Sequence, residues 1–277
     1  MKFAQIASYL FIILLSQPCI AGLLTPDIDP LNTTISTADI APFLSNDIVI
    51  DNNQLTLTPK ILGNPKGMTY LSQGDSFYSR GEFDLNKRYA LYRIEKKYIN
   101  ELNQKTLGNQ LSLVGYAKIS VDSAIPSAKN ISLFTLITSK KEARKGDLIL
   151  PDNIDQNVPK KISIQTLHSS NSGHILGFSK RINIAAAGDS VIIDKGQRDD
   201  IKLGTLFSVP EKAPSNIVMA PTDENATIIT ESLNDFYPAA SVGSIIVYKV
   251  YPKMSIGLII KASEIIRAGD IIKGDQL

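Results

Sequence analysis

The sequence Gly-Asp-Ser-Phe-Tyr-Ser-Arg-Gly at residues 74–81 returns in altered form as Gly-Asp-Ser-Val-Ile-Ile-Asp-Lys-Gly at residues 188–196. A second shared pattern closes each copy. It reads Ala-Arg-Lys-Gly-Asp-Leu-Ile at residues 143–149 and Ile-Arg-Ala-Gly-Asp-Ile-Ile at residues 266–272. A repeated unit bounded by the same turns predicts two related modules. Such a duplication favours a packing or binding unit over an enzyme with one asymmetric site.

The Gly-Asp pairs have a physical role in this pattern. Glycine adopts the positive φ that a tight turn requires, and an aspartate side chain accepts hydrogen bonds from the amides of its own turn. We therefore predict structural turns at Gly74, Asp75, Gly146, Asp147, Gly188, Asp189, Gly196, Gly204, Gly269 and Asp270.

The residues between the turns favour strands. Residues 111–121 and 131–138 are rich in β-branched side chains, and residues 89–98 fit both strand and helix spacing, with strand favoured by the second copy. Residues 48–50 and 55–57 flank a turn-rich triplet and predict a hairpin.

We thus predict a mainly β protein with two tandem, diverged small β-barrel-like modules. The first module covers residues 39–155 and the second covers residues 156–277, with a long polar connection at 210–241 inside the second. Residues 1–21 read as a signal peptide, and residues 22–38 as a flexible or extended lead-in.

The signal peptide prediction rests on the order of its parts. Lys2 is basic, residues 6–15 are almost wholly apolar, and cleavage is expected after about Ala21. Cys19 follows a proline, so we do not expect lipid attachment there. Removal of Cys19, the one cysteine of the chain, would exclude disulfides, a cysteine nucleophile and a cysteine-ligated metal. The predicted location is the periplasm.

Charge and apolar content limit the classes of partner that we expect. The 277 residues carry a formal net charge of +2, which gives no support for nucleic-acid binding. The longest later apolar run, residues 256–260, ends at Lys261 and is too short to cross a membrane. We therefore expect no membrane-spanning segment after cleavage of the signal peptide.

Several stretches together resemble one exported protein family. They are residues 36–44, the tyrosine-rich strand after Gly81, residues 137–147, residues 247–251 and the ending at 267–272. In their order they are similar to the C-terminal region of bacterial LysM-domain peptidoglycan-binding proteins. The likeness implies an envelope protein whose partners are peptidoglycan or envelope assembly proteins.

A second likeness concerns the fold. Residues 191–207 resemble small β-barrel modules of flagellar and other envelope assembly proteins, which supports an architecture more than an activity. The LysM module that binds glycan in the first family is not found in this sequence. The glycan-binding role of the LysM module therefore cannot be assigned to any residue of this sequence.

The densest basic cluster contains Lys140, Lys141, Arg144 and Lys145. These residues are the candidate ligand contacts, for an anionic glycan, a teichoic-type polymer or lipid headgroups. The alternative interpretation, which we favour, is a solvated hairpin tip that protects edge strands. Four tyrosines also have two interpretations: they could form a sugar-stacking platform, or they could pack as cross-strand partners in the core, which we favour. These tyrosines are Tyr78, Tyr89, Tyr92 and Tyr98.

No pattern predicts catalysis, a cofactor or a metal. His168 and His174 lie in a turn-rich segment and could form a metal pair with Asp189, but no third ligand follows zinc-like spacing. The sequence has no Gly-x-Ser-x-Gly nucleophile elbow, and convergence of two carboxylates cannot be deduced from it.

The sequence therefore predicts a non-enzymatic, exported cell-envelope protein with a peptidoglycan-associated binding or scaffolding role. Two alternatives remain: an accessory component of a secretion or motility assembly, and a wall-active hydrolase. If a specific site exists, it is expected in the parts that are not duplicated or in the groove between the two copies.

Overall fold

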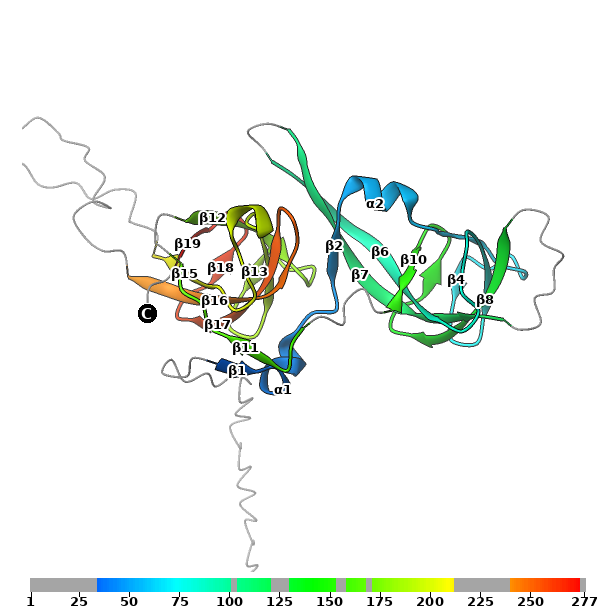
Figure 1. Cartoon of the computed structure of the whole chain (residues 1–277), viewed down its shortest axis with the longest axis horizontal. Helices are drawn as coiled ribbons and strands as arrows, with labels where there is room; N and C mark the ends of the chain where they lie inside the picture. The colour runs from blue at the N-terminus through cyan, green and yellow to red at the C-terminus, as the bar shows by residue number, and fades with distance from the viewer. Residues whose placement is uncertain are drawn as a thin grey trace, which may run out of the picture.

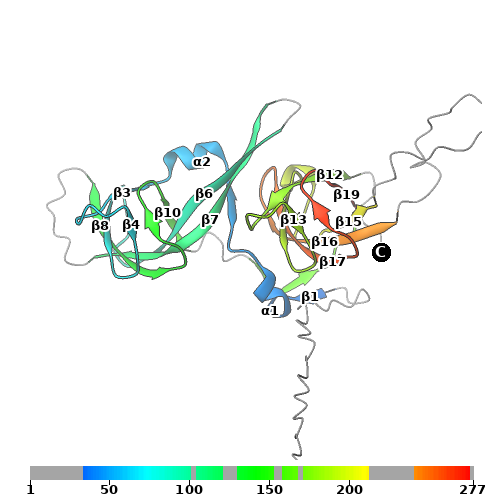
Figure 2. The same ribbon diagram turned by 180° about the vertical axis from the view of Figure 1, so that it is seen from behind.

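The computed structural model describes residues 34–100, 104–120, 130–152, 158–167, 171–211 and 240–274. These residues form two β bodies that lie side by side, seen from the front in Figure 1 and from behind in Figure 2. The prediction of a mainly β protein is confirmed, and it includes a closed barrel.

The first body is a seven-stranded antiparallel sheet with the order β10-β6-β7-β8-β5-β3, in which β2 also pairs with β7. Its strands are β2 (Ile48–Ile50), β3 (Ile61–Gly63), β5 (Ser76–Arg80), β6 (Arg88–Ile99), β7 (Thr106–Ile119), β8 (Ile131–Ser139) and β10 (Leu148–Pro151). Two short strands, β4 (Tyr70–Leu71) and β9 (Ala143–Arg144), form a separate pair. The sheet curls until its end strands β3 and β10 meet. Two hydrogen bonds join them: Ile61 N–H donates to Asp147 O at 2.9 Å, and Ile149 N–H donates to Pro59 O at 2.8 Å.

The second body is a closed six-stranded barrel with the order β12-β14-β17-β16-β15-β19. Its strands are β12 (Ser172–Phe178), β14 (Ser190–Ile193), β15 (Leu206–Pro210), β16 (Ser241–Val250), β17 (Ser255–Ala262) and β19 (Ile271–Gly274). A short pair, β13 (Ile184–Ala185) with β18 (Ile266–Arg267), lies beside it, and a 3₁₀ turn, η3 (Gln197–Asp199), follows β14.

The order of strand pairing repeats between the two bodies. The path β3-β5-β8-β7-β6-β10 in the first corresponds strand by strand to β12-β14-β17-β16-β15-β19 in the second, and the pair β4–β9 corresponds to β13–β18. Curling each sheet until its ends meet leaves few unpaired edges and encloses an apolar core. Phe77, Leu91 and Phe134 are fully buried in the first body, and Phe207 and Ile245 in the second.

Four Gly-Asp pairs form the same turn. Their glycines have φ of +90° at Gly74 and Gly188, +92° at Gly146 and +91° at Gly269. In each turn the aspartate carboxylate accepts a hydrogen bond, between 2.7 and 3.2 Å long, from the backbone N–H three residues earlier. The four acceptors are Asp75, Asp147, Asp189 and Asp270.

Gly204 and Gly196 serve a different purpose. Gly204 has φ of +86°, and a Cβ there would lie 1.8 Å from Ser163 O, so the backbone itself fills the space. Gly196 lies in a turn, since its carbonyl accepts from Asp199 N–H at 2.9 Å, but its φ is −145° and not positive. A Cβ at Gly196 would lie 2.4 Å from Tyr251 O, and close approach of two backbone segments is therefore what requires glycine at that position.

The predicted hairpin at residues 48–57 is wrong. Strand β2 is followed by the helix α2 (Asn52–Leu57) instead of a second strand. Asp51 Oδ1 accepts from Gln54 N–H at 2.7 Å, and Gln54 Oε1 accepts from Asp51 N–H at 3.3 Å. This capping box satisfies amides that open the helix, so it outweighs the strand-like alternation of residues 55–57.

The end of the predicted lead-in is ordered and belongs to the second body. Strand β1 (Thr34–Ser36) pairs with β11 (Lys161–Ser163), and α1 (Thr37–Ile40) and η1 (Ala41–Phe43) follow it beneath the barrel (Figure 1). Ile40 is fully buried in a cluster with Ile246 and Tyr248 of the barrel. Residues 39–44 were predicted to belong to the first module, but they pack on the second body, because their apolar partners lie there.

Candidate functional site

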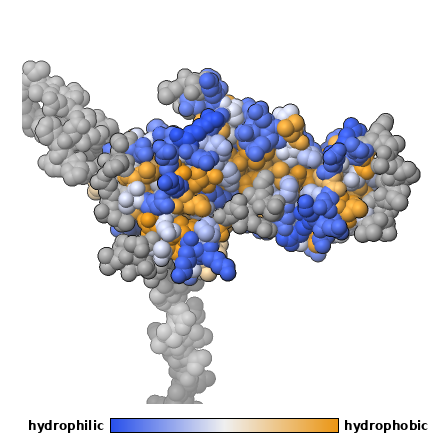
Figure 3. Space-filling view, viewed as in Figure 1, coloured by the Kyte–Doolittle hydropathy of each residue, from blue (hydrophilic) through white to orange (hydrophobic). Residues whose placement is uncertain are grey.

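A cleft of about 1180 Å³ lies where the two bodies face each other. The first body contributes residues of β6, Gln110 of β7 and residues 141–142 after β8, while the second contributes residues 177–183 and 267–268. Figure 3 shows hydrophilic residues over much of both bodies on one face, with hydrophobic residues exposed between them. The groove between the two modules was one of the two places in which a site was expected from the sequence, if a specific site exists.

The cleft has an excess of positive charge. Its lining holds two carboxylates, those of Glu95 and Glu142, and six cationic side chains: Arg93, Lys96, Lys141, Lys180, Arg181 and Arg267. Asp147 and Asp189, which lie outside the lining, bind Arg93 and Lys180 at 2.8 and 2.7 Å. Six cationic groups thus face four acidic ones even when these partners are included, so the cleft attracts anionic groups.

Glu95 joins the two bodies. Arg181, from the second body, donates to Glu95 Oε2 from Nη2 at 2.7 Å and from Nε at 3.0 Å. Lys141 Nζ lies 3.2 Å from Glu95 Oε1, and Ser112 Oγ donates to the same oxygen at 2.6 Å. Burial alone would raise the pKa of Glu95, but hydrogen bonds from these donors outweigh it and lower the pKa to about 2. Glu95 therefore carries its charge at neutral pH.

A buried polar network forms a second contact between the bodies. Gln110 Nε2 donates to Asp47 Oδ2 at 2.7 Å and to Phe178 O of the barrel at 3.3 Å, and Tyr98 O–H donates to Gln110 Oε1 at 2.9 Å. Burial raises the pKa of Asp47, and burial together with the charge of Asp47 raises the pKa of Tyr98. Gln110 and Tyr98 line the cleft, so this network fixes part of its wall.

A lysine of the barrel completes the connection. Lys249 is buried and donates from Nζ to Ser45 O at 2.9 Å and to Asp47 O at 2.8 Å. Both carbonyls belong to the segment that leads into β2 of the first body. The two bodies are therefore held by charge-assisted hydrogen bonds on both sides of the polar network.

Several polar side chains of the lining have no bonded partner among the described residues, including those of Ser179, Glu142 and Arg267. Ser179 Oγ is buried without a hydrogen bond there. Glu142 is exposed and forms no side-chain ion pair in the described part of the chain, and the same holds for the guanidinium of Arg267. A buried hydroxyl without a partner costs free energy, so such a group in a cleft points to a ligand.

The structure divides the basic cluster that the sequence singled out. Lys141 lines the cleft, and Lys140 and Lys141 together line a smaller hollow of about 300 Å³ next to it. Arg144 lies on β9 and Lys145 in the following turn, and neither belongs to the lining of the cleft. Arg144 has its counterpart in Arg267 of the second copy, which does line the cleft.

Sequence reasoning missed most of the lining. Arg93, Glu95, Ser179, Arg181 and Arg267 were not among the predicted contacts. The adjacent basic pair at 180–181, just before the second Gly-Asp turn, was a signal that could have been found. The other residues lie far apart in the chain and carry no shared motif.

The predicted tyrosines belong to the interior. Tyr89, Tyr92 and Tyr98 are 6%, 2% and 4% exposed, and Tyr89 packs edge-on against Phe134 at a ring distance of 5.6 Å. Tyr78 is partly buried on β5. Rings buried to this degree cannot stack on a sugar at the surface, so the core interpretation holds for these three.

The structure describes part of the possible metal pair formed by His168 and His174 with Asp189. His174 Nδ1 lies 3.1 Å from Asp194 Oδ2, whereas Asp189 binds Lys180 and its own turn. Within the described ranges no group of three or more His, Cys, Asp or Glu side chains could hold a metal ion. His168, Cys19 with the rest of the predicted signal peptide, and residues 212–239 lie outside the described residues. The helices that are described include none of the length and apolar character needed to cross a membrane.

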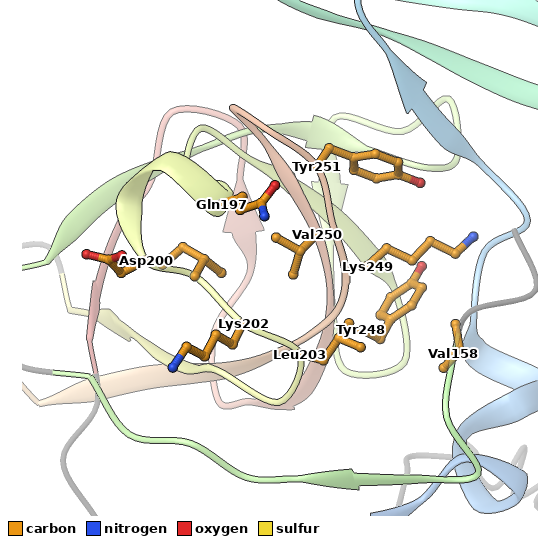
Figure 4. Close-up of a pocket in the computed structure, with 10 residues that line it drawn as sticks. Val158, Gln197, Asp200, Lys202, Leu203, Tyr248, Lys249, Val250 and Tyr251 are labelled. Atoms are coloured by element: carbon orange, nitrogen blue, oxygen red, sulfur yellow. The ribbon is translucent and has the colours of Figure 1, made fainter. Parts of the chain in front are cut away.

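A second hollow, of about 700 Å³, lies on the barrel (Figure 4). Val250, Leu203 and the ring of Tyr248 give it apolar lining, and Asp200 and Lys202 lie to the left of them in this view. The Tyr248 hydroxyl accepts from Ser45 N–H at 3.0 Å and donates to Ser190 Oγ at 2.9 Å. Gln197, Asp200 and Lys202 add polar side chains to its lining, but none of the described lining residues has a buried side-chain polar atom without a partner, as Ser179 has in the cleft.

No family model matches the chain, and no curated protein matches it either.

Proposed function

We propose that this protein is a non-enzymatic component of the cell envelope that is exported to the periplasm and binds peptidoglycan through the cleft between its two bodies. The basic cleft is the observation that carries the proposal. Peptidoglycan carries carboxylates on its peptides, and a cleft with excess positive charge attracts such groups. The signal peptide and the resemblance to wall-associated proteins, both inferred from the sequence, support the same location.

The chemistry of the cleft supports binding over hydrolysis. A glycosidase needs one carboxylic acid with a raised pKa to protonate the leaving group. Glu95 has its pKa lowered to about 2, and its oxygens are occupied by Ser112, Lys141 and Arg181. Such a carboxylate is an ion-pair partner that holds two bodies together, and it lacks a proton to donate at neutral pH.

The test is retention of the purified protein on isolated peptidoglycan sacculi. We expect the wild-type protein to sediment with sacculi, and the double substitution Lys180→Ala with Arg181→Ala to lower the retained fraction roughly tenfold at low salt. Arg144→Ala with Lys145→Ala is the matched control, because it removes another adjacent basic pair that lies outside the cleft lining. Retention no greater than that of an unrelated periplasmic protein would refute wall binding. Equal losses in the two double variants would refute the cleft as its site.

A further inference from the structure

We infer that the cleft recognises a short zwitterionic peptide, which carries carboxylates together with a free ammonium group. This inference rests on the proposed function and names the part of the wall that the cleft binds. Its basis is the presence of both signs of charge in the lining, together with the side chains of Ser179, Glu142 and Arg267, which have no partner among the described residues.

The mixed charge of the lining separates a zwitterion from other wall polymers. Glu95 and Glu142 lie among the six cationic side chains of the cleft. A uniformly anionic polymer, such as a polyphosphate, would be attracted by the excess cations but would bring like charge next to the exposed carboxylate of Glu142, which has no cationic partner among the described residues. A neutral glycan would leave the excess cations without a counter-charge. A ligand with both carboxylate and ammonium groups can satisfy each kind of side chain.

The unpaired side chains supply one complementary group for each part of such a ligand. The guanidinium of Arg267 presents parallel N–H donors that match a carboxylate. The exposed carboxylate of Glu142 accepts from an ammonium. Ser179 Oγ, which is buried without a partner in the described residues, can donate to a carboxylate oxygen or accept from an N–H.

The remaining lining and the size of the cleft also suit a peptide. Phe178, Ile182 and Ala268 provide apolar contacts for aliphatic side chains. The volume of about 1180 Å³ exceeds the roughly 300–1,000 Å³ that is usual for small-molecule sites. The cleft therefore has room for a peptide of several residues, whereas a single amino acid would leave most of it filled with water.

The experiment is calorimetric titration of the purified protein with four probes. They are the tripeptide Ala–γ-Glu–diaminopimelate, the same tripeptide with its amines acetylated, peptide-free glycan strands, and inorganic polyphosphate. We expect the free tripeptide to bind, and acetylation to weaken its binding roughly tenfold or more, because an ion pair with a carboxylate is lost. Glycan strands and polyphosphate should bind at least about tenfold more weakly than the free tripeptide.

Variants then locate the site. Arg267→Gln and Glu142→Gln should each weaken binding of the tripeptide roughly tenfold, and Ser179→Ala by roughly threefold to tenfold. Lys145→Gln and Glu82→Gln are the matched controls, because they change one charge of the same sign outside the cleft, and they should leave the affinity unchanged. The comparison of free and acetylated tripeptide needs no substitution, so it tests the inference even where a variant folds poorly.

Several outcomes would overturn the inference. Equal affinity for free and acetylated tripeptide would show that the ammonium is not recognised, and tighter binding of polyphosphate or glycan would identify another ligand. A tripeptide that fails to bind while sacculi still retain the protein would refute the peptide ligand and leave wall binding intact. A protein that binds the tripeptide but is not retained on sacculi would refute the proposed function instead.

Discussion

The substitution Glu95→Gln tests how the two bodies are held together. Glutamine keeps the shape of the side chain but removes the charge that Arg181 and Lys141 share. A pKa lowered from 4.5 to about 2 corresponds to at most about 3 kcal/mol of stabilisation. The Arg181 and Lys141 side chains are 84% and 45% exposed, so solvent screening reduces this to about 1–2 kcal/mol.

The sign of the pH dependence follows from the lowered pKa. The folded protein holds the Glu95 proton more weakly than the unfolded chain does, so the stabilisation is fully present above about pH 4.5. It is lost as the pH falls from about 4.5 towards 2. At pH 7 the free energy of unfolding of the Glu95→Gln protein should therefore be about 1–2 kcal/mol lower than that of wild type. This difference should vanish near pH 2.

Urea unfolding at several pH values between 7 and 2 measures this difference. Glu82→Gln, at an exposed position, is the control and should match wild type at every pH. Added salt should reduce the effect of Glu95→Gln, because the cationic partners are exposed. A difference between wild type and Glu95→Gln that stays constant from pH 7 to pH 2 would refute the charge-based account, as would wild-type stability of the variant at pH 7.

Three further substitutions test the fold by urea unfolding. Gly204→Ala should cost at least about 3 kcal/mol, because a positive φ costs about 1–2 kcal/mol and a Cβ would also lie 1.8 Å from Ser163 O. Lys249→Met should cost about 2–4 kcal/mol, because it removes an ammonium that donates to two carbonyls between the bodies. Asp51→Ala should cost about 1 kcal/mol through loss of the cap of α2.

Each of these has a matched comparison. Gly146 has φ of +92° and no atom near an added Cβ, so Gly146→Ala should cost only about 1–2 kcal/mol. Equal costs at Gly146 and Gly204 would contradict the steric argument. Lys202→Met, at an exposed lysine of the same body, should be nearly neutral. Asp51→Asn retains a capping oxygen, and should therefore keep most of the stability that Asp51→Ala loses.

The parts of the fold that could be predicted are those that local chemistry specifies. A strand at residues 89–98 was expected by comparison with the second copy, because the local spacing fitted both strand and helix, and β6 covers it. The hairpin at 48–57 failed because a strand-like triplet competes with a capping box, and only the energies of the two alternatives decide between them. At Gly196 the sequence could not give the reason for the glycine, because a glycine required by a close backbone approach looks the same in sequence as one required by its φ.

The candidate site was far less predictable. Lys141 was named as a candidate contact because it lies in a dense basic run, although a solvated hairpin tip was the favoured interpretation. Glu95 and Arg181 are separated by 86 positions and meet only because two bodies pack together. Ser179 is an ordinary serine in the sequence, and its significance comes from the burial of its hydroxyl without a partner among the described residues.

The sequence by itself determined the duplicated turns and the β character of this protein, because a glycine with positive φ and an aspartate that binds its own turn act within a few residues of each other. Only the tertiary structure decided that residues 34–44 pack on the second body rather than the first, and that cations from both bodies line one cleft. Those contacts depend on burial and charge pairing between distant segments, which local residue patterns do not encode.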